Sequence, residues 1–171
     1  MQAETIYEEN LAAYVKIMLR RPFAKILVSR KSNPWGSILP HAPQDYFDGV
    51  ERLLKTTAPT EVASNRDFTP SALKRVVKEY SAKDVRKHVE ALAKRVEKHF
   101  TEASEKEITQ RSGIARGTVV VGVWKACGTE TVRMTESFSN LISQCYGQSG
   151  VSLDYTVADA QAAFRSNRVG T

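Results

Sequence analysis

The sequence has few of the features that mark secreted, membrane-spanning or disulfide-bonded chains. Its 171 residues include two cysteines, Cys127 and Cys145, which are too few for a disulfide framework. It contains no apolar run of about 18 residues, the length that a membrane-spanning helix needs. The first ten residues are acidic and lack the basic-then-apolar order of a secretory signal peptide. These absences predict a protein of the cytosolic type.

Motifs for catalysis and cofactor binding are also missing. Gly117 and Gly122 have the spacing that opens a phosphate-binding loop, but apolar residues stand where the Lys and the Ser or Thr are required. His88 and His99 lie about three helical turns apart without a carboxylate–histidine metal motif, and we interpret them as ordinary, partly exposed helix residues. The sequence therefore predicts no catalytic residue, cofactor, metal ion or small-molecule substrate.

Apolar residues recur at helical spacing along nearly the whole chain. Residues 118–127 are rich in Val and Thr, which favours a strand, but the longer pattern favours one long helix. Its apolar positions follow steps of four and three: Val120, Trp124, Cys127, Thr131, Met134, Phe138, Leu141 and Cys145. We expect Gly122 and Gly128 to weaken this helix, Gly147 to end it, and the two cysteines to be separate core thiols about 27 Å apart.

Capping signals locate three further helices. Thr69 precedes a proline, and Ser81 and Thr156 each precede an Asp by three positions, which is typical of helix N-termini. Residues 4–20 and 45–54 also have the pattern of amphipathic helices, and Tyr7 falls on the apolar face of the first. In the helix that begins at Thr156, Val157 and Phe164 are expected to point inward. Five or six helices and no strand predict an all-α fold, an elongated bundle or rod, with one domain over residues 1–171. Its predicted core includes Leu92, Val96, Phe100, Trp124, Phe138, Leu141 and Phe164.

Basic residues are concentrated in one part of the chain. Between residues 73 and 99 there are nine Lys or Arg and four acidic residues, which accounts for most of the net charge of +6. One interpretation is a solvated helix surface with pairs such as Glu90–Lys94. The other is a surface for an acidic protein or for anionic lipid, whereas no helix-turn-helix or stacking platform supports specific nucleic-acid binding. The candidate interaction surface consists of five residues that we expect to be exposed: Arg86, Lys87, Lys94, Arg95 and Lys98.

Several segments together resemble the extreme C-terminal region of fungal exocyst complex component one, the Sec three subunit. They are "RRPFAKI", "DYFDGVERLL", "SAKDVRKHVEALAKRVEKHF", "GVWKAC" and "SLDYTVADAQAAFR". The resemblance implies a non-catalytic helical part of the exocyst, the complex that holds secretory vesicles at the plasma membrane before fusion. It also implies other exocyst subunits as partners and a cytoplasmic location, peripheral to the plasma membrane at sites of secretion.

Two further expectations concern the rest of the subunit and contact with the membrane. The chain is expected to be a fragment of a longer subunit, without the lipid- and GTPase-binding domain that lies at the family's N-terminus. Weak contact with an anionic membrane remains an expectation. The alternative function is a basic helical module that binds anionic lipid or nucleic acid.

Residues 28–44 interrupt two helical patterns with Pro34, Pro40 and Pro43. If this block is removed, the apolar steps of the flanking segments join into one regular pattern. We therefore interpret the block as an irregular, exposed insertion. Two origins are open, an in-frame intron retained in the coding sequence and an insertion inherited in one lineage.

The intron hypothesis predicts a shorter transcript. Val-Ser at the start of the block can be encoded by a splice-donor consensus, and Gln44 at its end by a splice acceptor. Transcript reads across this site should then include a form that lacks the codons of residues 28–44 and keeps the reading frame. Uniform retention of those codons would support the inherited insertion instead.

Overall fold

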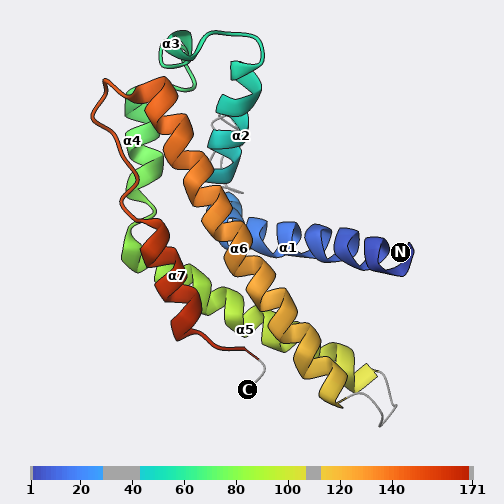
Figure 1. The fold of residues 1–171 in the computed structure, drawn as a ribbon. Coiled ribbons are helices and arrows are strands. Elements are labelled where there is room, and N and C mark those ends of the chain that lie inside the picture. Colours follow the sequence, from blue (N-terminus) through green and yellow to red (C-terminus); the bar gives the residue numbers. More distant parts are fainter. Residues whose placement is uncertain (1, 29–42, 107–112, 170–171) are drawn as a thin grey trace.

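A computed structural model describes residues 2–28, 43–106 and 113–169, and within these ranges it contains seven α-helices and no strand. The all-α prediction is confirmed, with one short helix, α3, beyond the six helical segments recognised in the sequence. The helices are α1 (Gln2–Val28), α2 (Pro43–Leu54), α3 (Pro59–Val62), α4 (Pro70–Lys78), α5 (Ala82–Lys106), α6 (Gly113–Tyr146) and α7 (Val157–Ser166) (Figure 1).

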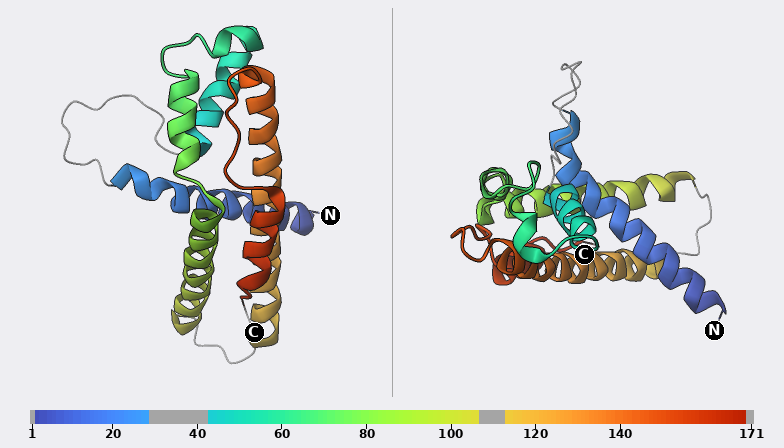
Figure 2. Two further views of the ribbon diagram at one scale, coloured as in Figure 1. Left: turned by 90° about the vertical axis from the view of Figure 1, so that its left-hand side faces the viewer. Right: turned by 90° about the horizontal axis from the view of Figure 1, so that it is seen from above.

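The helices form an elongated body from which α1 projects. Helices α4 and α5 follow one another along the long axis, and α6 runs along the same axis (Figure 2). Helix α7 packs against both α5 and α6. Helix α1 crosses this body at a steep angle, contacts α5, α6 and α2, and extends its N-terminal end away from the other helices (Figures 1 and 2).

Helix α6 carries the apolar stripe that the sequence predicts. Val120, Trp124, Cys127, Met134 and Phe138 are all buried along it. Near the C-terminal end the predicted Cys145 is buried too, but Ile142 is buried in place of Leu141, which is only half-buried. The helix ends at Tyr146, directly before Gly147, as predicted. The left-handed residue of the following turn is Gly150, with φ of 66°.

The predicted helix caps are present. The hydroxyl of Thr69 accepts a hydrogen bond from the amide of Ala72 at 3.3 Å. Asp84 accepts hydrogen bonds from the amide and hydroxyl of Ser81, which lowers the pKa of the Asp84 carboxyl. Thr156 and Asp159 form a complete capping box at the start of α7. Each cap satisfies amide groups that have no partner within the helix.

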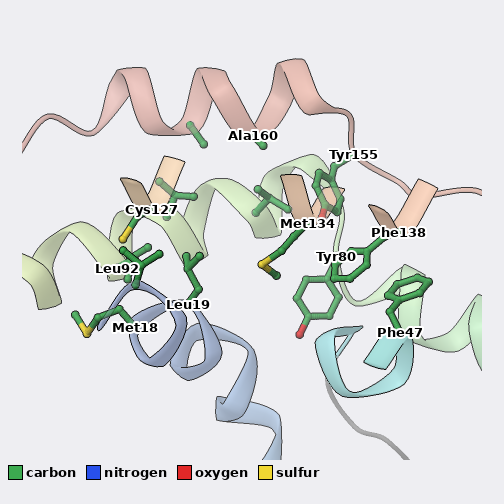
Figure 3. Packing of buried hydrophobic residues seen from close by; sticks show 14 of the residues in the cluster. Met18, Leu19, Phe47, Tyr80, Leu92, Cys127, Met134, Phe138, Tyr155 and Ala160 are labelled. Atoms are coloured by element: carbon green, nitrogen blue, oxygen red, sulfur yellow. The ribbon is translucent and has the colours of Figure 1, made fainter. Parts of the chain in front are cut away.

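The core lies where α1, α2, α5 and α7 meet α6. Phe47 of α2 stacks on Phe138 of α6, with ring centroids 4.2 Å apart and planes 16° apart (Figure 3). Of the predicted core residues, Leu92, Val96, Trp124 and Phe138 are buried. Phe100, Leu141 and Phe164 are partly buried and pack against the core, so the predicted burial is complete for four of the seven residues and partial for these three.

Helix α7 contacts the body through small residues. Ala160 and Ala163 are its buried side chains, whereas Val157 and Phe164, expected to point inward, are half-buried. The Phe164 ring lies against Gly128 of α6, where a Cβ atom would be 3.4 Å from Cδ1 of the ring. Gly128 therefore lies at a close helix contact, which gives a structural role to a residue with low helix propensity.

A chain of hydrogen bonds joins three separate segments at one end of the body. The Tyr146 hydroxyl donates to the main-chain carbonyl of Phe68 at 2.6 Å, and it lies 3.0 Å from the hydroxyl of Tyr46. The Phe68 ring covers Gly49, where a Cβ atom would be only 2.6 Å from Cζ of that ring. Helix α2, the segment before α4 and the end of α6 are thereby fixed to one another.

Truncation of the core aromatics should strongly destabilise the chain. Phe138→Ala removes the stacked partner of Phe47, and Trp124→Ala removes the indole that packs on Phe164. Each should lower the free energy of unfolding by about 3–5 kcal/mol, measured by urea denaturation. Ile17→Ala, at a side chain that is 58% exposed, is the control and should change it by less than about 0.5 kcal/mol. Losses below about 1 kcal/mol at both aromatic positions would contradict the core assignment.

The two cysteines are free and buried, as predicted. Burial raises the pKa of the Cys127 thiol from 9.0 to about 12, and it also raises the pKa of Cys145. Both thiols therefore stay protonated and unreactive in the folded chain at neutral pH.

Alkaline pH should destabilise the fold through Cys127. The folded chain holds the thiol proton more tightly than the unfolded chain. The resulting contribution to the free energy of unfolding is complete below pH 9 and is lost as the pH rises towards 12. The urea midpoint should fall over this range, and burial of Tyr46, Tyr146 and Tyr155 acts in the same direction. In Cys127→Ala the midpoint should fall less steeply with pH. An equal slope in both proteins would show that Cys127 does not contribute.

The ends of the predicted insertion belong to helices. Val28 is the last residue of α1, and Pro43 and Gln44 are the first two of α2. Residues 29–42 lie outside the described part of the chain, so the prediction of an exposed insertion stays a prediction. The two helices run in different directions, α2 along the body and α1 across it (Figure 2).

Candidate interaction surfaces

The candidate basic residues all lie on α5, but they do not share one side of it. Lys87, Lys94 and Lys98 are exposed and lie on the side opposite the buried Val89 and Val96. Arg86 and Arg95 are separated by about two and a half helical turns. They therefore flank the lysine row on opposite sides of the helix.

Acidic side chains on the same helix already pair with two of these lysines. The Lys94 ammonium lies 2.7 Å from Glu90, and that of Lys98 lies 3.5 Å from Glu102. The first contact lowers the pKa of Glu90 and raises the pKa of Lys94. Exposed pairs of this spacing contribute little to stability, so the lysines remain available to a partner that offers better acceptors.

Arg95 differs from the other four. It is half-buried, so the expectation that all five are exposed holds for four of them. Arg95 lies one turn before His99, whose ring stacks on Tyr14 of α1 and shares a hydrogen bond with its hydroxyl at 2.8 Å. The Nη1 atom of Arg95 is enclosed and has no hydrogen-bond partner among the residues that the structure describes. A buried donor without an acceptor lowers the stability of the folded chain, which distinguishes this arginine from the solvated lysines.

A groove of about 790 Å³ lies where α1 crosses α2 and α6. Its apolar lining includes Leu11, Phe47 and Leu141 from these three helices. Charges of both signs stand around it: Glu8, Lys16, Asp48, Glu51, Lys125, Glu130 and Arg133. Arg133 pairs with Glu130, so some of this charge is internally balanced.

A second groove of about 500 Å³ lies between α6 and α7. Helix α6 contributes Trp124, Lys125, Gly128, Thr129 and Val132, and α7 contributes Gln161, Phe164 and Arg165. Trp124 and Phe164 are in contact, with ring centroids 4.7 Å apart, and the indole nitrogen donates to the Phe164 carbonyl at 3.4 Å. The charged residues that line this groove are both cations.

Helix α1 also exposes large apolar side chains. Ile6 and Ile17 are 56% and 58% exposed, and because they are about three turns apart they lie on the same side of the helix. Tyr7, which the sequence pattern placed on the packed face, is half exposed near Gly122 of α6. Apolar residues lie on several sides of α1, so the sequence pattern did not distinguish the packed face of the helix from the exposed face.

The sequence did not predict either groove, because each depends on how distant helices cross. No group of three His, Cys, Asp or Glu that could hold a metal ion occurs among the described residues. None of the helices in the described ranges has the length and apolar character needed to cross a bilayer.

Comparison with known proteins finds relatives among exocyst components. Residues 42–148 match the family described as "Exocyst complex component Sec3, C-terminal". The chain is 29% identical over 159 residues to exocyst complex component 1 of Mus musculus, covering 92% of this chain and 14% of that protein. It is 26% identical over 164 residues to exocyst complex component 1 of Drosophila melanogaster, covering 95% of this chain and 15% of that protein.

No solved structure matches the chain. The two relatives are animal proteins, so a fungal affinity stays a prediction. The family match spans α2 to the end of α6, which includes α5 and the helix that organises the core. The chain belongs to the family of C-terminal regions of the exocyst component Sec3.

Proposed function

We propose that this chain is a non-catalytic helical part of the exocyst and acts in docking secretory vesicles at the plasma membrane. The observation that carries the proposal is the family match over residues 42–148, together with two relatives named exocyst complex component 1. In this proposal the chain works in the cytoplasm, peripheral to the membrane, as part of a longer subunit. Its contribution is to present helix surfaces to other exocyst subunits.

The lysine row of α5 is the proposed docking surface, with Arg95 beside it. Acidic side chains of a neighbouring subunit would take over Lys94 and Lys98 from their partners on the same helix. Arginine can bind a carboxylate through two parallel hydrogen bonds, whereas lysine acts as a point charge.

Charge reversal on α5 should weaken assembly without unfolding the chain. The triple variant Lys94→Glu, Arg95→Glu, Lys98→Glu should reduce co-purification of other exocyst subunits with the tagged chain by about tenfold. Its helical circular dichroism should stay close to that of the unchanged chain, since two of the three side chains are exposed. Loss of the circular dichroism signal would show that these residues are structural.

Helix α4 supplies a control with the same change of charge. Lys74→Glu, Arg75→Glu, Lys78→Glu reverses three exposed cations there and should leave co-purification unchanged. If both triple variants weaken assembly equally, general charge and not the α5 surface is responsible. If neither has an effect, the α5 row is only solvated helix surface.

The alternative is a basic module that binds anionic lipid or nucleic acid. The lysine row of α5 and the net charge of +6 are the observations in its favour. This function predicts binding to anionic vesicles or to a polynucleotide that falls steeply between low and high salt. A sedimentation assay at two ionic strengths separates it from exocyst docking, which requires a protein partner.

A further inference from the structure

We infer that the groove between α6 and α7 binds a short acidic protein segment that carries one large apolar side chain. This site lies on the face of α6 lined by Trp124, Gly128 and Val132, and it does not include the α5 lysines. The inference goes beyond the proposed function, because it assigns a second surface and states the chemistry of its partner.

The shape of the groove selects an apolar side chain. Trp124, Gly128 and Val132 follow one another at every fourth position along α6, so they line one side of the groove. Because Gly128 has no side chain, the Phe164 ring of α7 packs directly against α6 there and forms a wall of the groove. A groove of about 500 Å³ with an indole and a phenyl ring in its walls suits a Phe or Leu side chain.

The charge of the groove favours a segment with acidic residues on both sides of the bound apolar side chain. Lys125 on α6 and Arg165 on α7 are exposed, and neither forms an ion pair within the described part of the chain. The Nε atom of Arg165 donates to the main-chain carbonyl of Gln161 at 3.4 Å, a neutral acceptor that leaves its charge unbalanced. No acidic residue of the described ranges lines this groove, in contrast to the groove beside α1.

A single segment can satisfy both features. Its apolar side chain packs against the Trp124 and Phe164 rings, and carboxylates before and after it reach Lys125 of α6 and Arg165 of α7. The buried anchor supplies most of the binding free energy, and the charges at the rim supply orientation and selectivity. A lipid headgroup would use the two cations but would leave the aromatic walls unfilled.

Tryptophan fluorescence can test this inference directly. The chain has two tryptophans, Trp35 and Trp124, so Trp35→Phe leaves Trp124 as a reporter inside the groove. The probe is a short blocked peptide with a central Phe flanked on both sides by Asp. It should change the intensity or the wavelength of the Trp124 emission in a saturable manner. The same peptide with Ala at its centre, or with Lys in place of Asp, should bind at least about tenfold more weakly.

Variants of the whole chain show where the peptide binds. Lys125→Glu with Arg165→Glu should weaken binding about tenfold, and the neutral pair Lys125→Gln with Arg165→Gln should weaken it less. Lys87→Glu with Lys94→Glu, the same change of charge on α5, is the control and should leave binding unchanged. Circular dichroism checks that each variant is folded.

Four outcomes would overturn the inference. The first is an unchanged Trp124 emission at millimolar peptide. The second is equal binding of the Asp-flanked and Lys-flanked peptides, and the third is equal loss of binding in the groove variants and the α5 control. The fourth is binding to anionic vesicles that depends on Lys125 and Arg165 while the peptide does not bind, which would assign the site to lipid.

Discussion

The side chains along one face of α6 hold the molecule together, because α1, α2, α3, α5 and α7 all pack on this helix. Its 34 residues span about 50 Å, so different parts of its face meet different elements. Trp124 meets Phe164 of α7, Phe138 meets Phe47 of α2, and Tyr146 binds the segment before α4. The C-terminal half holds the stacked aromatic pair and the hydrogen-bonded tyrosines. The half with Gly122 and Gly128 borders both grooves.

Helices were predictable where their signals are local or repeated. The caps at Thr69, Ser81 and Thr156 depend on residues three positions apart, and the face of α6 repeats over many turns. Helix α3 was missed because a single helical turn is too short to show a period. In α7 the buried residues are alanines, because the helix lies close to its neighbours. A pattern that gives most weight to large apolar residues therefore selected Val157 and Phe164 instead.

The interaction surfaces were less predictable than the fold. Counting charges located the basic part of α5, but it did not show that Arg86 and Arg95 lie on opposite sides of the helix, or that Arg95 is half-buried beside α1. Lys125 and Arg165 are far apart in the sequence and share a groove only because α7 packs back onto α6. Such sites depend on tertiary contacts that no local pattern contains.

The hydrogen bonds that join α2, α6 and the segment before α4 have a fixed direction. A carbonyl can only accept, so the one hydroxyl proton of Tyr146 goes to Phe68, and Tyr46 must donate to Tyr146. Substitution is therefore not equally tolerated at the two tyrosines. Phenylalanine at position 46 would leave the bond to Phe68 intact, whereas at position 146 it would leave a carbonyl and a buried phenol without their partner. Relatives can drift to phenylalanine at the first position more readily than at the second.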